Sequence, residues 1–387
     1  MNVKTTKKPQ PRYDVSWSQR FNMQQWGGDN LYPQHLQRIT SASGTAELCL
    51  NRYAKFIEGY GFNSELLSNS VVNRWGETAD DILHLVAQDV ARFGGFALHV
   101  NYNALCEVSE INYIPFEQCR LEEPDDAGYV GRILVHEDWY GCKTKNGKKM
   151  QVTEANIKRI AVFNPDPDVV ASQIENSGGV ANYSGQILWA SMDGKYNYPT
   201  PIYDAAVTEL STDEGLGNLK NRNVRNNFIV ACMLITKKGV PKLDEYGNEV
   251  SASMIEDEDL RAFQGDERSS KIMVVELEND EDKPEVVQFP TTNIDKEFTV
   301  TDESVIERIY AQFHQELFYS IRMGKLGFSG QVMQDAYRYY AGEVTNEQRF
   351  ISRNFAKVFS VFNSAVISSD YYLQPLKYVT EEGEINE

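Results

Sequence analysis

The apolar residues of this chain change their spacing near residue 94, and that change limits the folds open to it. Before it, Ile82, Val86 and Val90 recur every four residues, which predicts one face of an α-helix over about 77–93. After it, short β-branched or aromatic runs are broken by Gly, Pro, Asp and Asn, which is typical of antiparallel strands. The first 200 residues therefore predict an α+β domain with helices before a sheet.

The boundaries of this domain follow from local composition. Residues 1–30 contain scattered aromatics without a helical or strand period, so they predict an N-terminal arm that packs on something else, such as a neighbouring subunit. A helix that ends at Gly59 is expected next, with Leu48, Tyr53 or Ala54, and Ile57 on one face. Residues 165–200 predict loops with one strand at "QILWAS". The α+β domain proper is expected over 31–200.

The second half of the chain alternates between helices and a small β-rich module. A helix is expected within 201–227, and the module over 228–299 contains the strand-like runs "FIVACMLIT", "KIMVVEL" and "VVQFP", with a short helix near 256–264. The clearest helix is expected over 300–321, with Thr301 as its cap and Ile306 among its apolar residues.

A glycine-rich stretch ends that helix. "IRMGKLGFSGQVM" at 321–333 carries three glycines, two cations and no acid, and a loop is expected over 322–333. A long helix over 334–365 follows, interrupted near Gly342, and residues 366–387 predict a polar tail.

Composition excludes several classes of protein. With 387 residues and 41% apolar content, the chain can fill a core, so overall disorder is excluded. A net charge of −18 argues against a protein that coats nucleic acid, because phosphate binding is driven by Lys and Arg. Five cysteines without paired spacing suit reduced thiols in a cytoplasm. No signal peptide or membrane span of about 18 apolar residues is present, so a protein used inside a cell is expected.

Charge is unevenly distributed along the chain. Residues 241–300 contain 17 acids and 6 bases, a net of −11, whereas residues 216–238 contain five bases and no acid. The acids of the module can equally serve solubility alone. The pattern places a positive segment before a negative module.

Motifs for catalysis or cofactor binding are missing from the sequence. His136 and Cys142 flank a predicted turn without zinc-ligand spacing, and the acidic turns lack the rhythm of a calcium loop. "GLGNLK" at 215–220 interrupts a helix and does not form a phosphate-binding loop. The five histidines show no pairing with a nucleophile. We therefore expect no enzyme, no cofactor, no metal and no catalytic residues.

The order of elements resembles the portal proteins of tailed bacteriophages. The resemblance spans roughly 20–365 and is carried by element order and by phrases such as "WGGDNLYPQHL", "YPTPIYDAAVTEL", "NRNVRNNFIVACMLI", "KIMVVELENDEDKPEVVQF", "ESVIERIYAQFHQELF" and "FSGQVMQDAYRYY". The family has no short invariant signature. In its terms, 31–200 is the wing, 201–227 and 300–321 are two stem helices, 228–299 is the clip, 322–333 is the tunnel loop, 334–365 is the long wing helix, and 366–387 is a tail or minimal crown.

The resemblance also implies a function and partners. Portal proteins form closed rings, usually dodecamers, at one capsid vertex of the virion, assembled in the bacterial host cytoplasm. Double-stranded DNA is packaged through the ring by the terminase large subunit and ejected through it. The implied partners are further copies of the chain, DNA, terminase, the major capsid protein and a head-tail adaptor, with no membrane.

Particular residues can be assigned to the expected DNA channel and to the expected contacts between subunits. A channel that lets DNA slide is expected to have acidic walls and isolated rings of cations. Arg322 and Lys325 can form one ring, while Leu326 and Phe328 offer apolar contact. A possible second basic ring comprises Lys220, Arg222 and Arg225. Contact between subunits is expected along the second stem helix through Val305, Ile309, Phe313 and Leu317, and Tyr310 is expected to bury its flank.

A glycine loop with two surface cations is common between helices, so the loop by itself does not establish contact with DNA. Two other interpretations of the whole chain stay open. Another ring-forming head-tail connector or adaptor would share oligomerisation without a DNA-lining loop. A DNA-processing enzyme would need paired carboxylates in a cleft, which sequence cannot locate.

Overall fold

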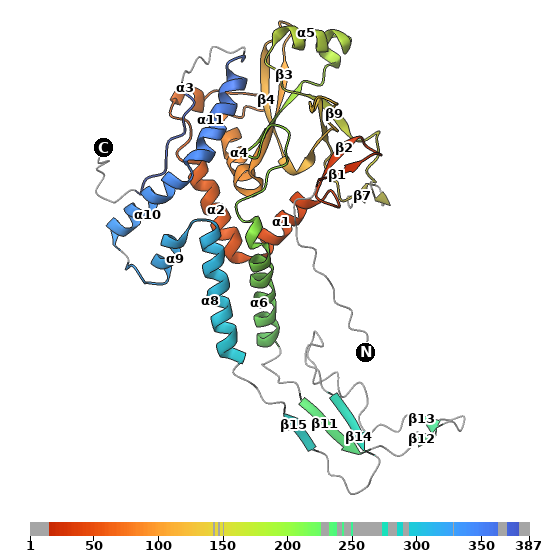
Figure 1. The fold of residues 1–387 in the computed structure, drawn as a ribbon, viewed down its shortest axis with the longest axis vertical. Coiled ribbons are helices and arrows are strands. Elements are labelled where there is room, and N and C mark those ends of the chain that lie inside the picture. Colours follow the sequence, from red (N-terminus) through yellow and green to blue (C-terminus); the bar gives the residue numbers. More distant parts are fainter. Residues whose placement is uncertain are drawn as a thin grey trace. The chain divides into compact units, whose positions relative to one another are not determined.

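The structure is a computed structural model that describes residues 15–141, 144–145, 148–149, 151–225, 232–237, 242–243, 249–250, 273–277, 285–288, 294–327, 329–362 and 370–378. Side chains are described for 16–141, 151–221, 302–327, 329–362 and 370–378. The chain folds into two compact units (Figure 1). The first unit comprises residues 1–211 and 306–387, and the second comprises residues 212–305.

Helices open the first unit, and their ends follow the local sequence. They are α1 (Tyr32–Ala42), α2 (Gly44–Glu58), α3 (Glu65–Ser68) and α4 (Ala79–Phe93). The predicted helix over 77–93 is confirmed as α4, which begins with a capping box between Thr78 and Asp81 and ends at Gly94 with φ of 81°. In α2 one residue was assigned to the wrong face, because Leu48 is 41% exposed.

A six-stranded sheet forms the centre of the first unit. Its order is β4-β3-β10-β9-β6-β5. The strands are β3 (Gly95–Tyr102), β4 (Val108–Ile114), β5 (Cys119–Leu121), β6 (Arg132–Val135), β9 (Lys158–Val162) and β10 (Gln186–Ser191). Two short strands, β7 (Thr144–Lys145) and β8 (Lys148–Lys149), pair with each other. The predicted strand-rich region and the strand at "QILWAS" are confirmed.

One pair in this sheet contradicts the antiparallel prediction. Strands β9 and β10 run parallel, because the chain between them crosses over through α5 (Pro167–Asn176). This helix lies in the part of 165–200 where loops were expected before the strand at "QILWAS". Its start carries a local signal, since Asp166 caps it and Pro167 occupies its first turn. The parallel pair was not predicted because the start of α5 lies in a stretch whose composition is typical of loops.

The N-terminal segment is part of the core and not a separate arm. Strands β1 (Val15–Ser18) and β2 (Met23–Trp26) form an antiparallel hairpin. Trp26 is fully buried and stacks on Tyr198, with ring centroids 4.6 Å apart. Arg120 is also fully buried and donates to both the side chain and the backbone carbonyl of Asn30. We expected residues 1–30 to pack on something else, such as a neighbouring subunit, and Trp26 and Asn30 pack on their own chain, while residues 1–14 lie outside the described part.

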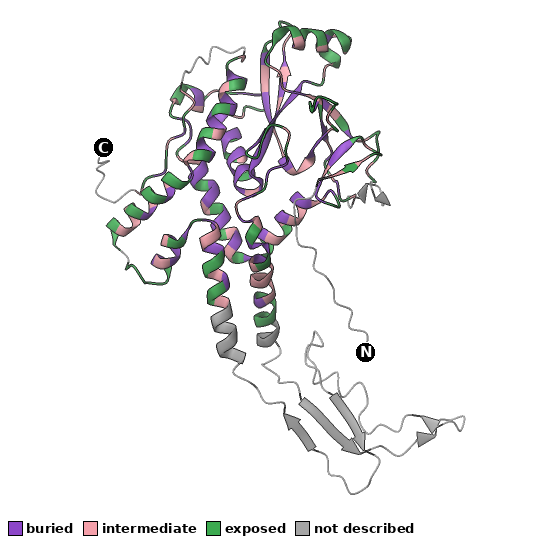
Figure 2. Ribbon diagram, in the orientation of Figure 1, coloured by how far each residue is buried: buried purple, intermediate pink, exposed green. Residues whose placement is uncertain are grey.

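Helix α11 (Thr345–Phe359) packs on the face of the sheet that carries Phe96. Phe96 of β3 contacts Phe350 and Phe355 of this helix, with ring centroids 5.7 and 6.2 Å apart. The buried residues drawn in Figure 2 run between α11 and the sheet. Part of the expected tail also packs here, since Leu373 is buried and bridges to Phe62. Residues 370–378 thus belong to the first unit.

The second unit contains a three-stranded sheet of order β14-β11-β15. Its strands are β11 (Cys232–Lys237), β14 (Met273–Leu277) and β15 (Glu285–Gln288), which confirms the three predicted strands. A further pair joins β12 (Lys242–Leu243) and β13 (Glu249–Val250). The helix expected near 256–264 lies outside the described residues. This unit is an insertion, because the chain leaves the first unit within one helix and returns within another.

Those two helices are α6 (Val207–Arg225) and α8 (Ile294–Gln312). The helix α6 is continuous through Gly215 and Gly217, so the interruption expected at 215–220 is wrong. The second predicted helix has different ends: α8 begins at Ile294, so Thr301 is not its cap, and it stops after Gln312. A separate helix, α9 (Glu316–Arg322), follows, and then α10 (Gly330–Glu343). The predicted interruption near Gly342 is confirmed, because α10 and α11 meet at Val344.

Candidate functional site

The glycine-rich stretch forms the turn of a helical hairpin between α9 and α10 (Figure 1). Ser329 caps α10 by accepting a hydrogen bond from the Val332 amide at 3.3 Å, so the loop is shorter than the expected 322–333. Gly324 and Gly327 both have φ of 71°, a backbone conformation that other residues adopt at a cost. The sequence thus places glycine where the turn requires it.

The side chains of this loop that the structure describes are exposed. Leu326 is 47% exposed. Arg322 donates from Nη1 to the Tyr310 hydroxyl at 3.0 Å, and this hydrogen bond raises the pKa of Arg322. The Lys325 ammonium lies 5.4 Å from the centre of the Tyr319 ring. Two cations and one apolar side chain of the expected set therefore lie together on one loop, and Phe328 lies outside the described residues.

The base of the hairpin is a helix break that the sequence did not predict. His314 has φ of 56°, and the Gln315 side chain is fully buried. The Gln315 amide donates to the Cys49 carbonyl at 2.9 Å and to the Tyr340 hydroxyl at 2.8 Å, and its oxygen accepts from Arg52 at 3.1 Å. These contacts satisfy the buried side-chain amide, while the backbone N–H of Gln315 donates to the Tyr310 carbonyl at 2.8 Å across the break. No glycine or proline marks the position, so no local signal could have found it.

A second contact closes the same base. His314 Nδ1 lies 3.1 Å from Glu343 Oε2, close to the junction of α10 and α11 at Val344. The Tyr340 hydroxyl also donates to the Phe313 carbonyl at 3.0 Å. Two helix breaks that are distant in sequence are therefore joined at the base, while the loop lies at the other end of the hairpin.

Most of the residues expected to contact a second subunit are buried within this chain. Ile309, Phe313 and Tyr310 are fully buried, and Phe313 stacks on Tyr203 at 5.3 Å. Val305 is also buried, and Leu317 is partly buried. The side chains of Ile309 and Phe313 are therefore unavailable to a second subunit. The helical period identified a core face, because an intrachain and an interchain apolar stripe look alike in sequence.

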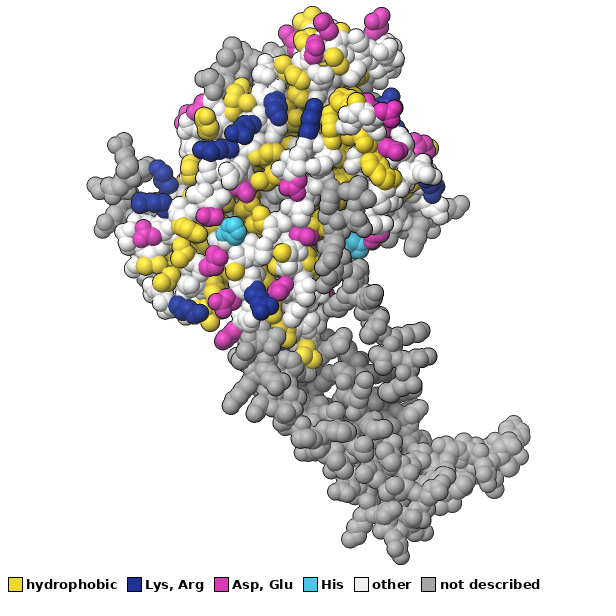
Figure 3. All heavy atoms as spheres, in the orientation of Figure 1, with side chains coloured by type: hydrophobic (Ala, Val, Ile, Leu, Met, Phe, Trp, Pro, Cys, Tyr) yellow, Lys and Arg dark blue, Asp and Glu magenta, His cyan; other side chains and the backbone are white. Residues whose placement is uncertain are grey.

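The possible second basic ring is only partly described. Lys220 of α6 forms a 2.7 Å ion pair with Asp302 of α8, within the second unit. Its charge is thus partnered by an acid of the same chain. Arg222 and Arg225 lie on the last turns of α6, and their side chains are outside the described set. On the face drawn in Figure 3, acidic and basic side chains are interspersed over the first unit.

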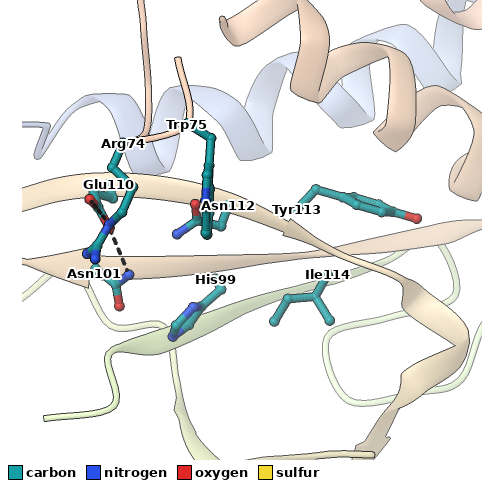
Figure 4. Close-up of a pocket in the computed structure, with 8 residues that line it drawn as sticks. All are labelled: Arg74, Trp75, His99, Asn101, Glu110, Asn112, Tyr113 and Ile114. Carbon is teal, nitrogen blue, oxygen red and sulfur yellow. Dashed lines mark hydrogen bonds and ion pairs between the residues drawn. The ribbon is translucent and has the colours of Figure 1, made fainter. Parts of the chain in front are cut away.

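A shallow pocket of about 390 Å³ lies on the β3-β4 part of the sheet (Figure 4). Trp75 is 71% exposed at its rim, and Arg74 makes a two-pronged ion pair with Glu110 at 2.8 and 2.9 Å. Asn112 is buried, and its Oδ1 has no hydrogen-bond partner. Burial lowers the pKa of His99, so a neutral imidazole donates to the Ser184 carbonyl at 2.7 Å. The hydrogen bond from Arg74 lowers the pKa of Glu110, so this carboxyl is held as the charged partner of Arg74 at the edge of the pocket.

Within the described ranges, no group of three or more His, Cys, Asp or Glu side chains could hold a metal ion. The same ranges contain no helix with both the length and the apolar character needed to cross a bilayer.

Comparison with known proteins gives structural likenesses alone. No family model and no curated protein match the chain. Several solved structures are similar to the chain. A chain of the virion of a native gene transfer agent particle has 11% identity and a TM-score of 0.49, over 90% of this chain and 83% of that one. A chain of the neck of the same kind of particle, computed with C12 symmetry, has 12% identity and a TM-score of 0.45, over 91% and 84%.

A portal protein is also among these structures. It is an HK97-family phage portal protein from Corynebacterium diphtheriae, with 10% identity and a TM-score of 0.34, over 85% of this chain and 89% of that one.

Proposed function

We propose that this chain is the subunit of a phage-type portal, a structural and non-enzymatic protein that forms a ring at one capsid vertex. The observation that carries the proposal is the path of the chain. An α+β unit leads through α6 into a small β-rich unit, and α8 leads back to a helical hairpin with a glycine loop and then to two joined helices. This is the order that the resemblance to portal proteins implies, from wing to stem, clip, stem, tunnel loop and long wing helix.

The loop chemistry supports a role in guiding DNA. Arg322 and Lys325 are exposed at the turn and have only phenol and aromatic-ring partners among the described residues. Cations without a carboxylate partner can attract phosphate, and a few of them per subunit give weak contacts that allow sliding. The strong overall negative charge of the chain works in the same direction, because it limits tight adhesion.

In this proposal many copies, usually twelve in such rings, close around a channel through which double-stranded DNA is packaged and later ejected. The ring serves as head-tail connector in the virion. It binds the terminase large subunit during packaging, the major capsid protein around its rim and a head-tail adaptor afterwards, and it is assembled in the bacterial cytoplasm. The cations Lys220, Arg222 and Arg225 remain a proposed second basic ring, with Lys220 bridged to Asp302.

Negative-stain electron microscopy of the purified chain tests the proposal directly. The expected result is a ring with a central hole. A monodisperse monomer under all assembly conditions would contradict it and favour the enzyme interpretation. If rings form, packaging assays on loop variants separate a portal from an adaptor ring, because an adaptor has no DNA-lining loop.

A further inference from the structure

Helix α11 carries a row of cations that the proposed channel does not use. Arg349, Arg353 and Lys357 recur every four residues and are all exposed. The opposite side of the helix is buried in the first unit and includes Ile351 and Phe355. Figure 3 shows several dark blue side chains on the upper part of this face, over the region of α11 and of the neighbouring sheet in Figure 1. We name Arg349, Arg353 and Lys357 the α11 row.

The charges of the α11 row are not neutralised by this chain within its described part. None of the three forms an ion pair there, whereas Arg74, Arg92, Arg159 and Arg308 each have a glutamate partner. Lys357 donates to Asn354 Oδ1 at 2.9 Å, which is a neutral partner. Burial and then the neighbouring charge of Lys195 lower the pKa of Lys357, so Lys195 adds a fourth cation near the end of the row.

The row is held on a rigid support. In the first turn of α11, Glu347 accepts from the Tyr53 hydroxyl at 2.8 Å, and the Gln348 amide donates to the Phe56 carbonyl at 3.0 Å. Phe350 packs on Phe96 of the sheet. These contacts fix the helix, so only the long side chains must become ordered when a partner binds, and the entropic cost of binding is reduced.

The spacing of the row fits a regular polyanion. Residues four apart are about 6 Å apart along a helix axis, so the three cations span about 12 Å. One strand of duplex DNA carries a phosphate about every 3.4 Å of axis, and therefore offers three or four phosphates over the same length. Two of the three cations are arginines, whose planar groups can bind phosphate through two hydrogen bonds.

We propose that the α11 row binds the phosphate backbone of double-stranded DNA, at a site separate from the loop between α9 and α10. The identification of the polyanion as DNA rests on the proposed function. An acidic protein surface could also meet the row, but it would have to present carboxylates at the same regular spacing, whereas DNA presents phosphates at such a spacing everywhere. The contact is independent of base sequence, because phosphate carries no sequence information.

The test uses the full-length chain, a short DNA duplex and fluorescence anisotropy over a range of salt concentrations. For the triple variant R349Q/R353Q/K357Q, the slope of log affinity against log salt is expected to fall by about 3, since each phosphate contact contributes about 0.9. Each single variant should lower the slope by about 1. The matched control K55Q/R132Q/K158Q removes three exposed cations from α2, β6 and β9 and should leave the slope nearly unchanged.

The outcomes separate the two proposals. Equal slopes for the α11 triple variant and the control would overturn the α11 row as a DNA site. Unchanged DNA binding with loss of ring formation in the α11 variant would also overturn it, and would assign the row to an acidic protein surface. If the wild-type chain forms no rings but its DNA binding still depends on the row, the row is supported and the portal proposal fails.

Discussion

The side-chain amide of Gln315 donates a hydrogen bond to the Tyr340 hydroxyl over 2.8 Å, and this bond joins the break after α8 to the last turn of α10. Both groups are buried, and the Tyr340 hydroxyl in turn donates a hydrogen bond to the Phe313 carbonyl at 3.0 Å. The hairpin that carries the glycine loop is thus fixed at its base by a polar network inside an apolar core. In such a network each group depends on the others for its partners.

Replacing Gln315 with methionine should destabilise the chain by about 2–4 kcal/mol, because the Cys49 carbonyl, the Tyr340 hydroxyl and Arg52 each lose a buried partner. Urea unfolding followed by circular dichroism measures the change. The control Gln331→Met removes an exposed side chain of α10 and should change the stability by less than about 0.5 kcal/mol. Equal effects of the two substitutions would show that the buried amide does not support the hairpin.

Removing the two loop cations in Arg322→Ala/Lys325→Ala should leave rings intact and impair DNA packaging or retention severalfold, since no carboxylate partner is lost with them. Packaged DNA per particle and ring integrity by microscopy are the two measurements. Arg338→Ala, which removes an exposed cation from α10, is the control and should package normally. Full packaging by the double variant would count against the guiding role of the loop.

Substitution by alanine should destabilise the chain at a loop glycine and stabilise it at a helical glycine. Gly324→Ala is expected to cost about 1–2 kcal/mol, because φ of 71° places its Cβ close to the following carbonyl although the surroundings are open. Gly342→Ala, within α10 and also open, should instead stabilise by about 0.5–1 kcal/mol. Thermal unfolding of both variants checks the two signs, and a shared sign would refute the conformational explanation.

The stability of the first unit should depend on pH through Asp89. Burial raises the pKa of this carboxyl well above its usual range, and the charge of Glu117 adds to the rise, while hydrogen bonds from Tyr113 and the Phe116 amide act against it. The folded state therefore prefers the protonated acid, and the wild type should lose stability as pH rises from about 4 through the raised pKa. Asp89→Asn should lack this loss, so its melting temperature relative to wild type should climb over that range.

Asp81 provides the comparison of opposite sign. Hydrogen bonds from Thr78 lower the pKa of Asp81, so its contribution is present above about pH 4 and is lost as pH falls. The melting temperature of Asp81→Asn relative to wild type should therefore improve on acidification. A pH-independent difference for Asp89→Asn would mean that its carboxyl does not titrate abnormally.

The sequence predicted the elements that have a local pattern. Helix α4, the strands of the main sheet and the break near Gly342 follow from apolar spacing, caps and glycine, and the two exposed cations of the loop were identified from the same stretch. The features that it did not predict depend on contacts between distant residues. Trp26 lies in a segment without a periodic pattern and is buried by Tyr198 and Phe116. The helix breaks at Gln315, whose side-chain amide donates hydrogen bonds to Cys49 of α2 and Tyr340 of α10. The α11 row was within reach, since its cations are four residues apart, but its exposure required the fold.

The contact between His314 and Glu343 and the buried hydrogen bond between Gln315 and Tyr340 fix the base of the hairpin, so the turn between α9 and α10 is its replaceable part. Its two ends are already brought together by the rest of the fold, so the chain entropy of closing it depends only weakly on its length, by about 0.6 kcal/mol for each doubling of a flexible loop. The turn at Gly324 and Gly327 could therefore be lengthened, shortened or exchanged for a foreign sequence with little effect on the remainder of the subunit. In the proposed ring, an engineer could change this turn in every subunit without redesigning the scaffold that surrounds it.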